Sequence, residues 1–359
     1  MPASLRIAIA AALLSPLPAA AAAETAQPRA ICAAQEWRTA FAVPGLTCIA
    51  TVHGLVIAPA DEAEMLRTVI DEAAARFERH FGTPRGSIAL VSGGSMTREQ
   101  VTFLRERGHR AMPWISAEQR NTLMGPRIRE QLSKQRPDLT GPALDAAVAS
   151  ALGAIPKQGA GLERGALAHE LNHIWFHMTF ESAGGVSEQP AKPGEIRYGS
   201  AAPDWIDEMA AVLGENDEIA ATRRAGLARL VSGTGEEGLY PLADYLSMSH
   251  PVMTMPNREA VLGKPAAPSG GAGVRIVARS DGGPAARPSP LLRFYIQSRA
   301  FADFLLDRTG DERVFLAIAK ALAGGESFDQ WLARDGKAHK LPATTAALST
   351  QWEAWVRSR

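Results

Sequence analysis

The stretch HELNH, at residues 169–173, carries the pattern that decides the fold. Two histidines four positions apart on a helix lie one turn apart on the same face, so His169 and His173 can reach one metal ion. The carboxylate of Glu170 then lies beside that ion, where it can take a proton from a water molecule bound to the metal. The stretch therefore predicts a helix that carries a metal site.

The residues around this stretch are apolar, as expected of a buried helix. These neighbours are Ala166, Leu167, Leu171, Ile174, Trp175 and Phe176. A buried helix with two histidines and a glutamate needs partners for them, because unpaired polar groups in a protein interior are costly. A metal ion supplies such a partner. The alternative is a pair of core histidines satisfied by ordinary hydrogen bonds.

A second stretch, WIDE at residues 205–208, supplies a third ligand. On a separate helix, Glu208 completes a site with three protein ligands and an open fourth position, which is the arrangement of catalytic zinc. Asp207 is its rival, but it points about 100° away on the helix. A third histidine at the metzincin spacing is excluded, because that position is Thr179. His177 lies one further turn along the first helix and is predicted to lie on the rim of the site.

Together, HELNHIWF at residues 169–176 and WIDE resemble the zinc core of the gluzincin metallopeptidases. The resemblance is strongest to the aminopeptidase N family and its stand-alone, thermolysin-like relatives. It implies a thermolysin-like zincin fold in which Zn²⁺ is bound by the two histidines and Glu208, with Glu170 as the catalytic base. It also implies that Glu215, seven residues after the ligand glutamate, orients a zinc-binding histidine. The alternative for Glu215 is a surface carboxylate near a helix end.

The resemblance extends to residues 295–310, which match a helix that the family opens with a tyrosine. It implies that Tyr295 donates a hydrogen bond to the oxyanion of the tetrahedral intermediate. The alternative is a half-buried core tyrosine with a satisfied hydroxyl, in which case Tyr240, Tyr245 and His250 are the other candidate donors. The chain has no Gly-x-Met-Glu-Asn motif, which the family uses to hold a free substrate amino terminus. Aminopeptidase activity is therefore not predicted.

The composition is that of an ordinary globular protein, with 359 residues of which 46% are hydrophobic and 21% charged. Its 38 basic and 38 acidic residues balance, and no basic run indicates a nucleic-acid partner. Length and pattern predict an α+β fold with two lobes and the zinc site in the cleft between them. We expect an N-terminal extension at 24–59, a small α/β lobe at 60–182 that ends in the metal helix, and an all-helical lobe at 183–359.

Hydrophobic periodicity predicts the individual elements. A strand is expected at 87–92, and a shorter strand-like piece at 47–52. Helices are expected at 61–81, 117–134, 141–154, 162–180, 204–214 and onward to about 230, then at 290–308, 311–323, 326–334 and 344–357. Proline and glycine predict loops at 183–203 and 251–290, the second of which is a candidate lid.

Residues 1–23 have the pattern of a signal peptide, with a short charged start, an apolar core and a small-residue region before an expected cleavage near Ala23. No other stretch is long and apolar enough to cross a bilayer, so no membrane span is expected after its removal. In an exported protein, Cys32 and Cys48 indicate one disulfide bond, with two free thiols as the alternative. A periplasmic or secreted protein is expected, and its oligomeric state is not indicated.

These features predict an exported zinc-dependent peptidase that hydrolyses amide bonds of a peptide or protein substrate with a metal-activated water. Two alternatives remain: a non-catalytic zincin-fold binding or scaffold protein, and a hydrolase of non-peptide amides such as cell-wall cross-links. Glu170 favours an enzyme, because a structural metal site does not need that carboxylate. The pattern does not indicate the substrate, or whether cleavage is internal or terminal.

Overall fold

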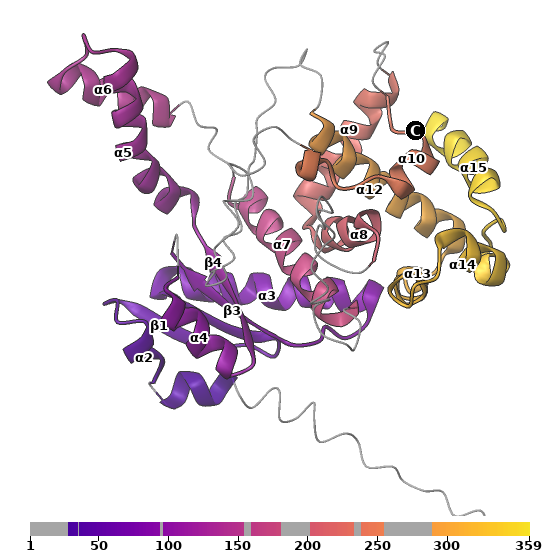
Figure 1. The fold of residues 1–359 in the computed structure, drawn as a ribbon, viewed down its shortest axis with the longest axis horizontal. Coiled ribbons are helices and arrows are strands. Elements are labelled where there is room, and N and C mark those ends of the chain that lie inside the picture. The colour runs from indigo at the N-terminus through magenta and orange to yellow at the C-terminus, as the bar shows by residue number, and fades with distance from the viewer. Residues whose placement is uncertain are drawn as a thin grey trace, which may run out of the picture.

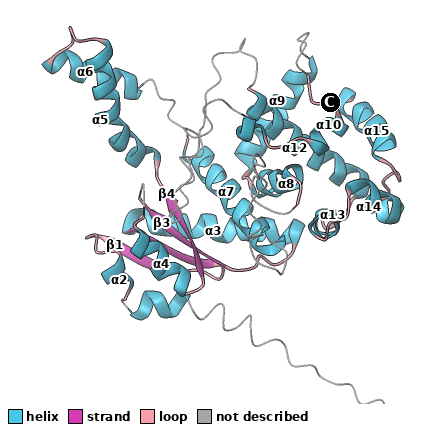
Figure 2. Cartoon of the chain, viewed as in Figure 1, coloured by secondary structure: helices cyan, strands magenta, loops and turns pink. Residues whose placement is uncertain are grey.

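The computed structural model describes residues 28–34, 36–93, 96–153, 159–180, 202–232, 238–254 and 289–359. The expected signal peptide and most of the two expected loops, at 183–203 and 251–290, lie outside these residues. Within them, the first part of the chain forms a four-stranded sheet with helices, and the later part is helical (Figure 1, Figure 2). This mixed architecture agrees with the predicted α+β class.

The sheet has the strand order β1-β2-β3-β4. Its strands are β1 Leu46–Ala50, β2 Gly54–Pro59, β3 Ser87–Ser92 and β4 His109–Trp114. β1 pairs with β2 in the antiparallel sense, and the other neighbours are parallel. The sequence predicts β3 and most of β1 but not β2 or β4. Because β1 and β2 pair with the rest of the sheet, residues 46–59 belong to the α/β lobe and not to an extension before it.

Neighbouring residues of the buried strands face two separate layers of helices. Val56 of β2 lies in the larger core, together with α3 (Ala60–Phe81). The adjacent Leu55 lies in a smaller core, together with α2 (Trp37–Ala40) and α4 (Arg98–Glu106). Helices therefore cover both faces of the sheet, which explains why its inner strands are continuous apolar runs.

A disulfide bond joins Cys32, in a helical stretch at 28–34, to Cys48 of β1. This confirms the predicted pairing. The bond ties the residues that precede the sheet to its antiparallel strand. None of the described helices is both long and apolar enough to cross a lipid bilayer.

The other elements are helices. Their bounds are α5 Ala117–Gln135, α6 Gly141–Gly153, α7 Ala160–Phe180, α8 Asp204–Gly214, α9 Asp217–Ser232, α10 Leu242–Ser247, η1 Pro251–Thr254, α12 Pro290–Thr309, α13 Val314–Ala323, α14 Phe328–Asp335, η2 Gly336–His339 and α15 Thr345–Arg357. α5 and α6 pair with each other and project away from the rest of the molecule (Figure 1). The predicted helices are all present, with ends within three residues of the predicted ones.

Helix α7 lies between α3 and α8 and connects the two parts of the molecule (Figure 1). On one side, Phe176 of α7 packs on Phe81 of α3, with ring centroids 5.6 Å apart. On the other side, α7 and α8 approach so closely that a Cβ atom at Gly214 would lie 2.0 Å from Asn172 Nδ2. A side chain at position 214 would displace the buried side chain of Asn172, so glycine allows the close approach of the two helices.

Candidate metal centre

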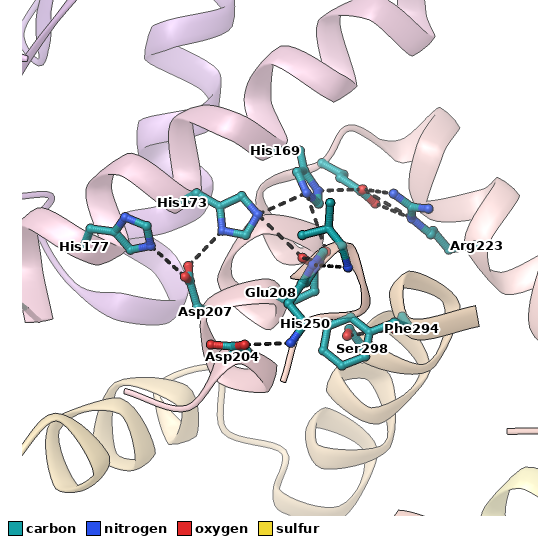
Figure 3. A network of polar contacts seen from close by, with 12 residues as sticks. His169, His173, His177, Asp204, Asp207, Glu208, Arg223, His250, Phe294 and Ser298 are labelled. Carbon is teal, nitrogen blue, oxygen red and sulfur yellow. Dashed lines mark hydrogen bonds and ion pairs between the residues drawn. The ribbon is translucent and has the colours of Figure 1, made fainter. Parts of the chain in front are cut away.

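Three buried side chains converge between α7 and α8 (Figure 3). His169 and His173 come from successive turns of α7, and Glu208 comes from α8. The Nε2 atoms of the two histidines lie 3.2 Å apart. Glu208 Oε1 lies 3.5 Å from His169 Nε2, and Glu208 Oε2 lies 3.5 Å from His173 Nε2. The structure therefore brings together the three residues that the sequence indicates as ligands.

The opposite nitrogen of each histidine contacts a carboxylate. His169 Nδ1 lies 3.0 Å from Glu215 Oε1, and His173 Nδ1 lies 2.8 Å from Asp207 Oδ1. A carboxylate only accepts hydrogen bonds, so each Nδ1 carries a proton and donates it. In neutral rings, both Nε2 atoms then hold a lone pair directed at the space that they share with Glu208.

This arrangement fits a divalent cation. Both oxygens of Glu208 are buried, and no described residue makes a hydrogen bond of normal geometry to either of them. Around tetrahedral zinc, with metal–ligand distances of about 2.0–2.2 Å, neighbouring ligand atoms are about 3.3–3.6 Å apart. The two Nε2 atoms are 3.2 Å apart, and each lies 3.5 Å from the Glu208 oxygen nearest to it, which is close to that spacing. The buried histidine and glutamate side chains could therefore hold a metal ion.

Without a cation, a proton has to fill the same space. Burial opposes a charged His173, but Asp207 and Glu208 outweigh burial and raise the pKa of His173 well above its usual value. Burial likewise opposes a charged Glu208, but the neighbouring histidines, His169 foremost, hold its pKa well below the usual range. The three side chains thus form an ion-paired group, and a metal that binds there has to displace that proton.

A further layer of side chains holds the two supporting carboxylates. Glu215 receives a hydrogen bond of 2.6 Å from Arg223 Nη2, and Asp207 Oδ2 lies 2.6 Å from His177 Nε2. Burial opposes the charged form of Asp207, but His173 and His177 lower its pKa to about 2. His169 and His173 are therefore each backed by an ionised carboxylate that has its own cationic or donor partner, which fixes the orientation of the ring.

Tyr295 of α12 lies at the same site. Its ring stands edge-on to His169 at a centroid distance of 5.5 Å, and Arg223 Cζ lies 4.7 Å from the ring centre. Burial raises the pKa of Tyr295 well above its usual value, and Glu208 and Glu170 raise it further. The hydroxyl is therefore protonated at neutral pH, and no described residue accepts a hydrogen bond from it, so it is available as a donor. Glu170 is half-buried on α7.

The other candidate donors are less suitable than Tyr295. The buried Tyr245 hydroxyl donates to Ser298 Oγ at 2.9 Å, and the Tyr240 hydroxyl donates to the carbonyl of Pro290 at 3.2 Å. Both hydroxyls therefore already have acceptors. His250 lies at the site, with Nε2 3.3 Å from Glu208 Oε2.

Sequence reasoning missed three residues of this network. The pattern presents Asp207 only as a rival ligand, whereas in the structure Asp207 contacts the Nδ1 nitrogen of His173. The 100° offset from Glu208 was the available signal, because it turns Asp207 toward the next turn of α7. His177 lies at the edge of the site and contacts Asp207, a contact that the pattern does not indicate, and Arg223 has no signal in the pattern.

Comparison with models of known protein families, with curated proteins and with solved structures finds no match to this chain.

Proposed function

We propose that this protein is a zinc-dependent peptidase that hydrolyses amide bonds. One observation carries the proposal. The Nε2 atoms of His169 and His173 lie 3.2 Å from each other and 3.5 Å from the buried Glu208 carboxylate, while the Nδ1 atom of each ring donates a hydrogen bond to a second carboxylate. The ligand set of two histidines and one glutamate is that of catalytic zinc in hydrolases. Zinc bound there would act as a Lewis acid on the scissile carbonyl and acidify a water molecule.

The residues of the chain supply the remaining chemistry. Glu170 takes a proton from the attacking water, whose oxygen bonds to the carbonyl carbon, and passes that proton to the amide nitrogen as the C–N bond breaks. Tyr295, which is protonated, donates a hydrogen bond to the oxyanion that forms on the carbonyl oxygen. Glu215 and Asp207 keep the two ligand rings in place throughout.

Two other functions use the same site. A non-catalytic zincin-fold binding or scaffold protein would hold zinc without turnover, but Glu170 and the free hydroxyl of Tyr295 have no purpose in such a protein. A hydrolase of non-peptide amides, such as cell-wall cross-links, would use the same residues in the same roles. Only substrate tests distinguish it from a peptidase.

The proposed location is outside the cytoplasm, either in the periplasm or in the medium. The bond between Cys32 and Cys48 is compatible with an oxidising compartment, where such bonds persist. The charged, apolar and small-residue order of residues 1–23 supports export.

Metal analysis of the purified protein, combined with cleavage of a peptide library with and without a chelator, tests the proposal. We expect about one zinc per chain and cleavage that the chelator abolishes and added zinc restores. Glu170→Gln is the matched control, because it should keep the zinc and lower kcat by about 10²–10⁴-fold. Absence of bound zinc, or cleavage that survives the chelator, would contradict the proposal. Peptidoglycan fragments assayed in parallel separate the two hydrolase classes.

A further inference from the structure

His250 is a buried histidine that contacts the metal-binding group from outside it. It lies between α10 and η1 and is 1% exposed. Its Nε2 atom lies 3.3 Å from Glu208 Oε2 (Figure 3). It does not belong to the converging group formed by His169, His173 and Glu208.

The position of the proton on His250 follows from its other nitrogen. The backbone N–H of Val252 donates to His250 Nδ1 at 3.2 Å. Nδ1 is therefore an acceptor, and the proton of the neutral ring is on Nε2, which faces Glu208. An imidazole that carries its proton toward a carboxylate is a donor to that carboxylate and not a metal ligand.

The ring and backbone of His250 are both held. Phe294 packs edge-on against the His250 ring at a centroid distance of 5.1 Å, and the tilted ring of Tyr295 lies at 5.8 Å. The backbone N–H of His250 donates to Asp204 Oδ2 at 2.6 Å. Asp204 and Glu208 are four residues apart on α8, so they lie on the same face of that helix. His250 is thus joined to the ligand helix at two points, one turn apart.

We infer that His250 is a positioning residue that keeps Glu208 bound to the metal through a single oxygen. This inference rests on the proposed function. The Nε2–H of His250 faces Oε2 at 3.3 Å, and a small rotation of either side chain completes a hydrogen bond to Oε2 that leaves Oε1 for the metal. Without that donor, the carboxylate can turn and bind through both oxygens, which would fill the position that a reacting water and carbonyl need.

Two amide substitutions distinguish the contribution of His250 Nδ1 from that of His250 Nε2. His250→Asn places an amide near the position of Nδ1 and removes the donor to Glu208. His250→Gln reaches the position of Nε2 and can restore that donor. Zinc affinity is measured by competition with a chelator, and the visible absorption of the Co²⁺-substituted protein reports the coordination number, because it is weaker for five ligands than for four.

We expect His250→Asn to weaken zinc binding about 10–100-fold and to lower the Co²⁺ absorption, and His250→Gln to recover most of both. His339→Asn is the matched control, because His339 lies on η2 and stacks on Trp331, away from this network. It should leave both measurements unchanged. Thermal unfolding in the presence of a chelator checks that each variant folds.

The outcomes are distinguishable from failure of the proposed function. If the parent protein binds no zinc, the proposed function itself fails. If the parent binds zinc and His250→Asn has the same affinity and Co²⁺ spectrum, the inference about His250 is overturned, as it is if His250→Gln loses as much as His250→Asn. Should His250→Asn not fold, Asp204→Ala tests the same attachment by releasing the backbone of His250. It should weaken zinc binding, and an unchanged affinity overturns the inference.

Discussion

Two overlapping groups on α7 and α8 consist of residue types that can bind a metal ion, and they share His173. The first group is His169, His173 and Glu208, and the second is His173, His177 and Asp207. In the second group, the nitrogen–oxygen distances are 2.8 and 2.6 Å, which are ordinary hydrogen-bond lengths. In the first group, the separations are 3.2–3.5 Å, which are close to the distances expected between ligand atoms of one metal ion.

The difference shows that residue type alone does not define a metal site. The decisive feature is which nitrogen of each ring carries the proton. Asp207 accepts a hydrogen bond from the Nδ1–H of His173 and so leaves the lone pair of a neutral ring on Nε2, where it could bind a metal, whereas the Nε2 of His177 faces Asp207 itself. The second group therefore supports the first and does not compete with it for the metal.

Replacing Glu208 or its neighbour Asp207 with the matching amide tests whether the two groups have different roles. This pair of substitutions has the largest expected effect on zinc binding. Glu208→Gln removes a ligand and should abolish high-affinity zinc binding together with activity. Asp207→Asn removes a supporting acceptor and should weaken zinc binding by only about 10–100-fold. Chelator competition and metal analysis measure both. An equal loss of zinc affinity in the two variants would contradict the distinction between a ligand group and a supporting group.

Substitution of Tyr295 should affect catalysis without affecting the metal. Tyr295→Phe removes one donor to the oxyanion and should lower kcat by about 10²–10³-fold, with zinc content unchanged. Tyr245→Phe is the control, because its hydroxyl donates to Ser298 inside the core. It should cost about 1 kcal/mol of stability and leave kcat almost unchanged. A kcat for Tyr295→Phe equal to that of the parent would remove this tyrosine from the mechanism.

His109, another buried histidine, sharpens the comparison, because no carboxylate of the described residues contacts it. His109 of β4 lies 2.8 Å from the hydroxyl of Ser87, and burial lowers the pKa of His109 to about 4. The unfolded chain takes up this proton near pH 6.5 and the folded chain only near pH 4, so stability should fall as the pH drops through this interval. The full effect is at most about 3 kcal/mol.

Urea unfolding of the chelated protein at pH 7.5 and pH 4.5 measures this loss. His109→Asn keeps a short polar group next to Ser87 and removes the titrating ring, so the loss between the two pH values should be smaller than in the parent. The other histidines contribute equally in both proteins and cancel in the difference. A loss of the same size in both would show that His109 is not the group responsible.

Much of the fold follows from sequence periodicity, and the exceptions have physical causes. The long helices have apolar residues at helical spacing, and β3 is an apolar run between glycines. β4 was missed because His109, Arg110 and Pro113 interrupt such a run. Helix α4 was also missed, although Thr97 and Gln100 form a capping box that marks its beginning.

The candidate site likewise contains residues that the sequence predicts and residues that it does not. The spacing of the two histidines on one helix is local information, so the sequence predicts it. The contacts of Asp207, Arg223 and His250 depend on how separate elements pack, and no spacing along the chain encodes them. Sequence therefore identifies the groups that would touch a metal more readily than the groups that orient them.

The smallest expected effect comes from His177, and it tests the second group most directly. His177 is half-buried at the edge of the network, so water can replace it on Asp207 while Asp207 keeps its contact with His173. His177→Asn should cost about 0.5–1.5 kcal/mol of stability, leave zinc affinity nearly unchanged and leave one zinc per chain. If the parent instead binds two ions and this variant binds one, the second group is itself a metal site. In that case, interatomic distances alone would not distinguish residues that bind the metal from residues that only orient its ligands.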